Sequence, residues 1–259
     1  MSRFADLHAP GDPLVLPTAW DLASAAAYAR AGFVAVGTTS LGIAAAAGYR
    51  DAARTTRDAT VALATRLAAG PLLVSVDLED GYADSPREVA ALAADLAAAG
   101  VAGVNIEDGR GPGRLAPAAH LAAVVTAVKD AAPGLFVNAR TDAYWLRAAG
   151  PAEALDRVRA YERAGADGVF VPAAPEADVA ALAGAVAVPL NVLALPGGPT
   201  VPRLAELGVR RGSCGSLPFG VALGAAVDTV RAIAAGGPVP GADAPPYAEV
   251  DAWADPPPR

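Results

Sequence analysis

The sequence predicts a single α/β domain folded as a TIM-type (β/α)8 barrel. Short apolar runs alternate with longer segments of helical periodicity, and no two runs are joined by a hairpin signal. An Ala-Gly or Leu-Gly pair ends a helical segment before the next apolar run at residues 31–32, 99–100, 164–165 and 207–208. Glycine readily takes the left-handed conformation that ends a helix, so each pair indicates the turn of a repeated βα unit. An open, doubly wound sheet is the alternative that the same alternation allows.

The first half of the chain contains four expected strands and four expected helices. Apolar runs predict strands at residues 14–17, 33–37, 72–77 and 101–106. Helical periodicity predicts helices at residues 22–31, 56–69, 85–99 and 117–131. The third of these has a clear start, since Ser85 can cap it, Pro86 suits its first turn and Glu88 lies close behind.

The second half repeats the pattern and then changes composition. Strands are expected at residues 135–138, 168–171, 190–193 and, more weakly, 209–212. Helices are expected at residues 151–164, 176–185, 201–207 and 217–234. Proline and glycine crowd the sequence after Gly236, which predicts a barrel domain over residues 1–237 and an extended or disordered tail over 238–259.

Composition limits the partners and the compartment. The 259 residues are 54% hydrophobic, enough for one large core, and the net charge of −7 argues against nucleic acid as a partner. Charge or glycine interrupts the apolar stretches, so neither a membrane-spanning helix nor a signal peptide is expected. Cys214 is the single cysteine, which excludes an intrachain disulfide. A cytoplasmic protein without membrane contact is expected.

Two pairs of acids follow apolar runs. In extended backbone Asp77 and Glu79 point the same way, and two adjacent carboxylates repel unless a proton or a cation separates them. Glu107 and Asp108 follow the next apolar run. If both runs are parallel strands of one barrel, the acids share a rim, which favours a hard divalent cation such as Mg²⁺.

Other polar residues occur at the same ends of the expected strands. Thr39 and Ser40 follow the second strand and Arg140 the fifth, whereas the opposite turns consist mostly of alanine, glycine and proline. Barrel enzymes carry their active sites at the carboxyl ends of the strands. This asymmetry predicts an active site at that rim.

Five phrases in register resemble the isocitrate lyase/phosphoenolpyruvate mutase family. They are LPTAWD at 16–21, TTSLG at 38–42, VSVDLEDGY at 74–82, GVNIED at 103–108 and NARTD at 138–142. The resemblance covers about residues 10–235. It implies a magnesium-dependent barrel that acts on 2-oxo-acid or enolpyruvyl carboxylates and breaks or forms C–C or P–C bonds.

The resemblance also implies a metal site. Asp77 looks like the direct ligand of Mg²⁺, with Mn²⁺ as a substitute, and Glu79 and Glu107 look like acids that reach the metal directly or through water. Such a mixture suits Mg²⁺, which prefers oxygen ligands and keeps several waters.

A substrate site is implied beside the metal. Thr39, Ser40 and Leu41 resemble the loop that holds the substrate carboxylate, and Arg140 resembles the arginine that grips the same anion. Asp51 matches a family position near the reacting centre.

The chain departs from the family's lyases after the fourth strand. Residues 109–115 contain neither the cysteine nor the histidine of the true isocitrate and methylisocitrate lyases, so isocitrate cleavage is not expected. Pro172 replaces a family histidine or glutamate after the sixth strand, and Asn191 is expected to line the pocket instead. The glycine-rich loop at 109–113 is expected to act as a mobile lid.

The expected function is that of a Mg²⁺-dependent lyase that cleaves a C–C bond in a small 2-oxo- or hydroxy-di/tricarboxylate through an enolate-like intermediate. Oxaloacetate decarboxylation or hydrolysis, phosphonate chemistry and a non-catalytic metabolite-binding barrel are the alternatives. Exchange of the last helix, residues 217–234, between subunits would give a homodimer or homotetramer.

Structural roles would also explain several of these residues. Arg140 could pair with Asp142 or Glu107, Asp108 could be a salt-bridging residue, and Asp51 could belong to a turn. In the same way, Thr39 and Ser40 could cap the following turn.

Overall fold

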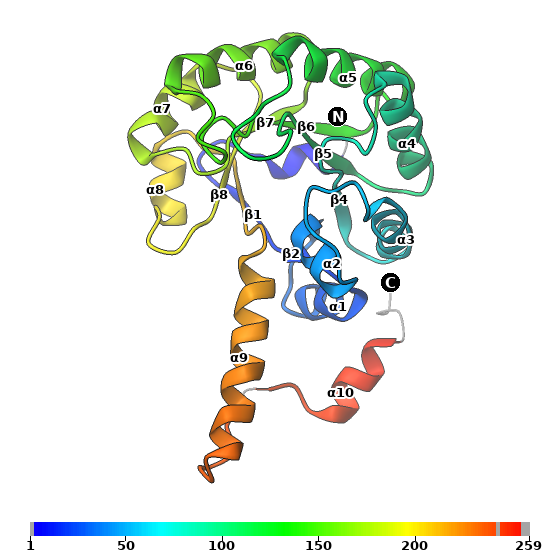
Figure 1. Cartoon of the computed structure of the whole chain (residues 1–259), viewed down its shortest axis with the longest axis vertical. Coiled ribbons are helices and arrows are strands. Elements are labelled where there is room, and N and C mark those ends of the chain that lie inside the picture. Colours follow the sequence, from blue (N-terminus) through cyan, green and yellow to red (C-terminus); the bar gives the residue numbers. More distant parts are fainter. Residues whose placement is uncertain (1–2, 242–243, 255–259) are drawn as a thin grey trace.

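The computed structural model describes residues 3–241 and 244–254, and its nine strands form one parallel sheet (Figure 1). The first two strands, β1 (Leu14–Leu16) and β2 (Thr18–Ala19), are halves of one strand interrupted at Pro17. β1 pairs with the last strand, β9 (Arg211–Ser213), and β2 pairs with β3 (Ala35–Thr38). The sheet therefore closes, which confirms the (β/α)8 barrel and rules out the open sheet.

Every expected strand and helix is present, with ends that differ from the predictions by at most two residues. The remaining strands are β4 (Leu73–Asp77), β5 (Gly103–Glu107), β6 (Phe136–Arg140), β7 (Gly168–Phe170) and β8 (Leu190–Leu193). The expected helices are α1 (Leu22–Arg30), α3 (Arg57–Ala68), α4 (Pro86–Ala98), α5 (Ala118–Ala131), α6 (Pro151–Arg163), α7 (Glu176–Gly184), α8 (Val201–Glu206) and α9 (Leu217–Ala234).

The sequence patterns did not predict two helices. α2 (Ser40–Ala46) occupies a stretch read as a loop, and α10 (Tyr247–Asp251) lies in the proline-rich tail. A 3-10 turn (Ala252–Ala254) follows α10 and contacts α1, where the Arg30 guanidinium lies 5.5 Å from the Trp253 ring. The rest of the expected tail includes residues 242–243 and 255–259, which lie outside the described residues, and the boundary at 237 stays a prediction.

A small second core closes the amino-terminal end of the barrel. Phe4, Leu16, Ala35 and Phe136 are buried together there, and the His8 ring stacks on Phe136 at 4.6 Å. The main core lies between the sheet and the helices that surround it. Because this second core covers the lower end, a cavity inside the barrel opens only at the carboxyl ends of the strands.

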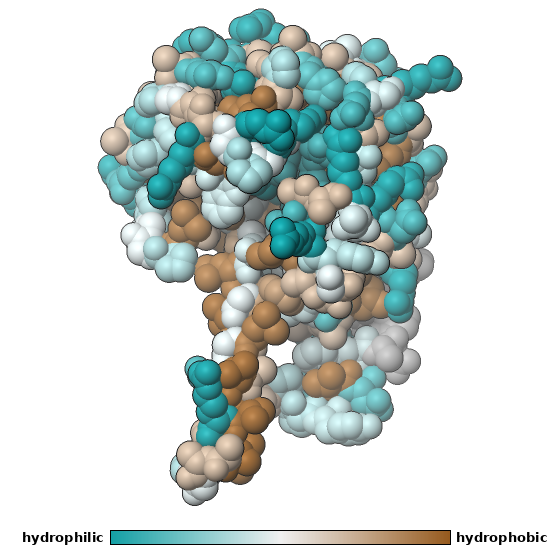
Figure 2. Space-filling model, in the orientation of Figure 1, coloured by the Kyte–Doolittle hydropathy of each residue, from teal (hydrophilic) through white to brown (hydrophobic). Residues whose placement is uncertain are grey.

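α9 projects away from the barrel (Figure 1), and none of its residues is buried. Its apolar side chains include Val221, 61% exposed, and Val230, 64% exposed, and Figure 2 shows them as a brown stripe along the projection. By length and mean hydropathy alone α9 is long and apolar enough to cross a membrane, although glycine and charged residues interrupt its apolar run as the sequence indicates. Asp228 and Arg231 form an ion pair at 3.3 Å on this helix, and such a pair is unfavourable in lipid.

Candidate active site

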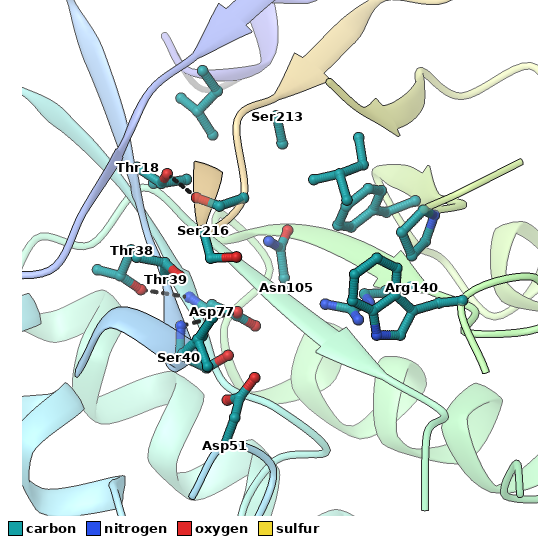
Figure 3. A pocket seen from close by; sticks show the side chains of 18 of the residues that line it. Thr18, Thr38, Thr39, Ser40, Asp51, Asp77, Asn105, Arg140, Ser213 and Ser216 are labelled. Carbon is teal, nitrogen blue, oxygen red and sulfur yellow. Dashed lines mark hydrogen bonds between the residues drawn. The ribbon is translucent and has the colours of Figure 1, made fainter. Parts of the chain in front are cut away.

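Two cavities at the carboxyl ends of the strands contain predicted site residues. The first, of about 110 Å³, reaches from the rim down into the barrel and is lined by Asp51, Asp77, Arg140, the β3–α2 junction and parts of β5, β7 and β9 (Figure 3). The second, of about 230 Å³, is lined by Ala52, Arg54, Glu79, Asp80, Glu107, Gly109, Arg110 and Gly111. The predicted site residues other than Asn191 therefore lie at the expected rim, divided between these two cavities.

Local structure at the start of α2 positions Thr39, Ser40 and Leu41 on the first cavity. The Thr39 side chain caps α2 by accepting a hydrogen bond from the Gly42 backbone N–H at 3.4 Å. A Cβ at Gly42 would lie 2.8 Å from both Thr39 and Trp20, so this turn requires glycine. Thr39 therefore both caps α2 and lines the first cavity. Trp20 packs against Phe219 and does not line the cavity.

Asp77 ends β4 and faces the first cavity from one side, with Arg140 opposite and Asn105 between them (Figure 3). The Ser40 backbone N–H donates to Asp77 Oδ2 at 3.4 Å. Burial raises the pKa of Asp77, Arg140 opposes the shift, and repulsion from Asp51 adds to it. The carboxylate is thus held in a buried place where a cation would stabilise its charge.

Glu79 does not lie on the same face as Asp77, contrary to the prediction. β4 ends at Asp77, and Glu79 has a left-handed backbone with φ of 52°, so the alternation of a strand no longer applies. Its carboxylate accepts a hydrogen bond from the Thr56 hydroxyl at 2.6 Å and one from the Arg54 backbone N–H at 3.2 Å. Burial nevertheless raises the pKa of Glu79, and the charge of Asp77 adds to the shift. Glu79 therefore lines the second cavity. Its charge interacts with that of Asp77, but the hydrogen bonds from Thr56 and Arg54 hold its carboxylate in a separate place.

Glu107 lines the second cavity and forms an ion pair with Arg140, Nη1 to Oε2, at 3.0 Å. Arg140 also pairs with Asp142 at 2.6 Å, so the ion pairs expected as its structural alternative are present. Burial raises the pKa of Glu107 well above its ordinary range against the opposing charge of Arg140, and Asp142 and Asp77 raise it further. The positive charge of Arg140 therefore balances only part of the negative charge of Glu107, Asp142 and Asp77.

Asp51 lies on the loop after α2 and lines the first cavity. It raises the pKa of Asp77, Glu79 and Glu107 by repulsion. The same loop is tied down by Arg54, which pairs with Asp80 at 2.6 Å. Two residues of this loop, Ala52 and Arg54, have positive φ, and such conformations persist where the surrounding structure holds them at a functional site.

The glycine-rich loop expected as a lid, 109–113, is in contact with this network. Arg110 pairs with Asp80 at 3.3 Å, and Gly109 forms an isolated bridge with Leu115. The sequence did not single out Arg54, Asp80 and Arg110, because their partners come from three separate loops.

The acids fit a magnesium ion that keeps part of its water shell better than a closed protein cage. In residues 3–241 and 244–254, no three His, Cys, Asp or Glu side chains converge closely enough to enclose a metal. All the acids nearby are oxygen donors that repel one another, and Mg²⁺ is usually held by one or two carboxylates plus water. This donor set suits a direct bond from Asp77 with water between the ion and the more distant acids.

Asn191, expected to line the pocket, does not line either cavity. Its Nδ2 donates to the Ser213 hydroxyl at 3.0 Å, so it supports a residue that does line the first cavity. The sequence missed Arg211, Ser213, Asn105 and Trp145 of this lining. Strand alternation could have revealed Arg211 and Ser213, which are two positions apart, but the run at 209–212 was too weak to fix a register.

Comparisons with known proteins agree with this geometry. A sequence model of the family described as phosphoenolpyruvate phosphomutase matches residues 4–234. An uncharacterized Mycobacterium tuberculosis protein is 46% identical over 251 residues, which are 96% of this chain and 95% of that protein. An oxaloacetate decarboxylase of Rhodopseudomonas palustris is 34% identical over 191 residues, which are 67% of this chain and 62% of the decarboxylase.

Solved structures share the fold. One from Burkholderia cenocepacia, provisionally described as a lyase or mutase, has a TM-score of 0.88 and 33% identity and covers 98% of this chain and 95% of its own. A phosphonopyruvate hydrolase solved with oxalate and Mg²⁺ has a TM-score of 0.83 over 97% of this chain and 94% of its own. At 22% identity this second likeness shows the fold alone.

Proposed function

Because the chain belongs to the phosphoenolpyruvate phosphomutase family, within the isocitrate lyase/phosphoenolpyruvate mutase superfamily of enzymes, we propose that it is a Mg²⁺-dependent lyase. Its substrate would be a small 2-oxo- or hydroxy-di/tricarboxylate, cleaved at a C–C bond through an enolate-like intermediate. The observation that carries this proposal is the group of mutually repelling buried acids around Asp77, compensated only in part by Arg140. The small first cavity suits an acid of a few carbons.

Arg140 would orient the substrate. Its Nε is paired with Asp142 and its Nη1 with Glu107, so the guanidinium plane is held in one orientation beside the cavity. A planar guanidinium fixed in this way can bind a carboxylate through its remaining N–H groups. Thr39, Ser40 and Leu41, at the start of α2, line the same cavity and would bind the carboxylate from the β3–α2 side.

Asp77 would hold the cation directly, and Glu79 and Glu107 would hold it through water, with Mn²⁺ able to take its place. When bound, the ion supplies a Lewis acid that stabilises negative charge on the substrate oxygen. Asp51 is the proposed proton-transfer group, because it lines the cavity near Asp77 and the loop at 109–115 contributes no cysteine or histidine.

Oxaloacetate decarboxylation or hydrolysis is the second candidate. It is supported by the R. palustris relative and by the missing cysteine and histidine at 109–115. Phosphonate chemistry and binding without turnover are further alternatives, and the family contains mutases as well as lyases.

Exchange of α9 between subunits of a homodimer or homotetramer would cover the apolar face described above. A cytoplasmic location without nucleic-acid or membrane partners accompanies this proposal. Charged substitutions at Val221 and Val230 should convert the oligomer to a monomer in analytical ultracentrifugation, whereas Thr229→Asp, on the same helix, tests the effect of charge alone. Monomeric wild-type protein would contradict the exchange.

A substrate screen tests the proposed reaction. Release of pyruvate, glyoxylate and oxalate is followed with Mg²⁺ and oxaloacetate, alkylmalates or phosphonopyruvate. We expect turnover of an alkylmalate or of oxaloacetate, and its loss in Asp77→Asn. Mg²⁺-dependent oxalate binding without any product would favour the binding-only alternative, and oxalate binding indifferent to Mg²⁺ would contradict the metal site.

A further inference from the structure

The inner end of the first cavity contains a buried arginine that has no acidic partner. Arg211 begins β9, is 1% exposed and lines the cavity. It forms no ion pair within 4.0 Å with an acid of the described chain, in contrast to Arg140 and Arg157. Burial lowers the pKa of Arg211 to about 9, with Asp77 opposing the shift, so the guanidinium remains charged at neutral pH.

The hydrogen bonds around Arg211 leave one of its nitrogens without a partner. Its Nε donates to the Ser213 hydroxyl oxygen at 3.1 Å, and its Nη2 lies 3.5 Å from Asn105 Oδ1. Nη1 is buried and has no hydrogen-bond partner within residues 3–241 and 244–254. A charged donor left unpaired in the interior is costly, and such groups are normally satisfied by an acceptor.

Neighbouring side chains also present donors. Ser213 Oγ accepts from both Arg211 Nε and Asn191 Nδ2, so both of its lone pairs are used and its O–H must donate elsewhere. Asn105 Oδ1 accepts from Asn138 Nδ2 at 2.8 Å, which leaves the Asn105 amide nitrogen as its free donor. Ser213 and Asn105 line the same cavity as Arg211.

The surroundings confine a ligand to the side of these donors that faces the rim. The Phe4 ring lies 6.0 Å from the Arg211 guanidinium, within the apolar core that closes the amino-terminal end of the barrel. The cavity continues upward to Asp77 and Arg140. A molecule bound at the rim can therefore extend inward, where it meets positive charge and donors.

We infer that Arg211, Ser213 and Asn105 form a subsite for a carboxylate-sized anion at the inner end of the cavity. In the context of the proposed function, on which this part rests, the anion is the second carboxylate of a dicarboxylate whose reacting end lies against Arg140. The subsite selects dicarboxylates over monocarboxylates of the same length, because a monocarboxylate leaves the buried charge unpaired.

Calorimetry with Mg²⁺ tests the selectivity. Wild-type protein is titrated with malonate and succinate and with the length-matched propionate and butyrate. We expect a preference for a dicarboxylate that falls about 10- to 100-fold in Arg211→Met and is partly kept in Arg211→Lys, since a hydrogen bond to a charged group is worth that much. Arg210→Met, which removes the same charge from the neighbouring position outside the cavity lining, should leave the preference unchanged.

A second measurement is independent of the reaction and of the metal. Formate without Mg²⁺ should raise the melting temperature of the wild type and of Arg210→Met but not that of Arg211→Met. If formate raises the melting temperature in this way but no dicarboxylate binds, the anion subsite is supported and the proposed substrate class is rejected. Equal formate shifts in all three proteins, or equal losses for mono- and dicarboxylates in Arg211→Met, would overturn the subsite.

Discussion

Glu107 and Asp108 are consecutive buried acids at the end of β5, and the fold surrounds them in opposite ways. Asp108 Oδ2 accepts hydrogen bonds from Tyr161 at 2.6 Å and from Arg157 at 3.0 Å. Its Oδ1 accepts from the Asp142 backbone N–H at 2.8 Å. Both carboxylate oxygens of Asp108 therefore have hydrogen-bond partners. Asp108 links the end of β5 to α6 and to the residues after β6, which is the salt-bridging role that the sequence analysis gave as an alternative.

Among the residues that the structure describes, Glu107 pairs with one counter-ion, Arg140, and shares it with Asp142. Other acids nearby raise the pKa of Glu107 beyond the effect of burial. The difference teaches that a buried acid is not by itself a sign of a functional site. Complete local compensation marks a structural acid, and incomplete compensation around a cavity marks one that is available to a ligand.

The same substitution, Asp→Asn, should have its largest effect on folding at Asp108. Asp108→Asn removes the buried acid that pairs with Arg157 Nη1 and leaves the guanidinium only its pair with the half-exposed Glu153, so the free energy of unfolding should fall by about 3 kcal/mol. Urea denaturation followed by circular dichroism measures this loss. An unchanged midpoint would show that Asp108 is not the structural acid of the pair.

Asp77→Asn should weaken Mg²⁺-dependent oxalate binding without lowering the stability of the metal-free protein. Asp77→Asn removes the proposed direct ligand, so Mg²⁺-dependent oxalate affinity should fall at least ~100-fold in calorimetry. The metal-free melting temperature should stay the same or rise, because one of several repelling acids is neutralised. A large fall in stability would remove the contrast with Asp108.

The pH dependence of the metal-free protein provides a further test. Burial raises the pKa of Asp77, Glu79 and Glu107 above their unfolded values, so the folded state binds more protons between those values. Stability should therefore fall as the pH rises above the ordinary carboxyl range of about 4, by about 1.4 kcal/mol for each unit of pKa difference. Urea denaturation against pH should give a flatter curve for Asp77→Asn/Glu107→Gln, and Mg²⁺ should restore the wild type at neutral pH. Parallel curves would contradict the incomplete compensation.

The smallest effect is expected at Thr56, whose hydroxyl donates to Glu79 at 2.6 Å. Thr56→Val keeps the shape and removes that donor, which should cost about 1 kcal/mol of stability at neutral pH. The loss should shrink at low pH, where Glu79 is protonated. Thr65→Val provides the control, because the exposed Thr65 hydroxyl donates only to a carbonyl within its own helix.

The location of the site could be predicted, because acids that follow apolar runs at parallel strand ends must meet at one rim. Asp51, Asp77 and the residues Thr39–Leu41 lie there on one cavity. The division of Asp77 from Glu79 could not be predicted, since it depends on a left-handed residue just beyond β4. Asn191 was placed on the correct strand, but its contact with Ser213 depends on the pairing of β8 with β9.

The sequence by itself determined the order of strands and helices, through the two periodicities of apolar residues, and the rim at which the acids gather. Only the tertiary structure decided which of the adjacent acids Glu107 and Asp108 would be neutralised. Arg157 and Tyr161 lie 49 and 53 residues from Asp108, and α6 packed on the sheet brings them there. Charge compensation depends on distance in space, and a sequence pattern fixes only distance along the chain.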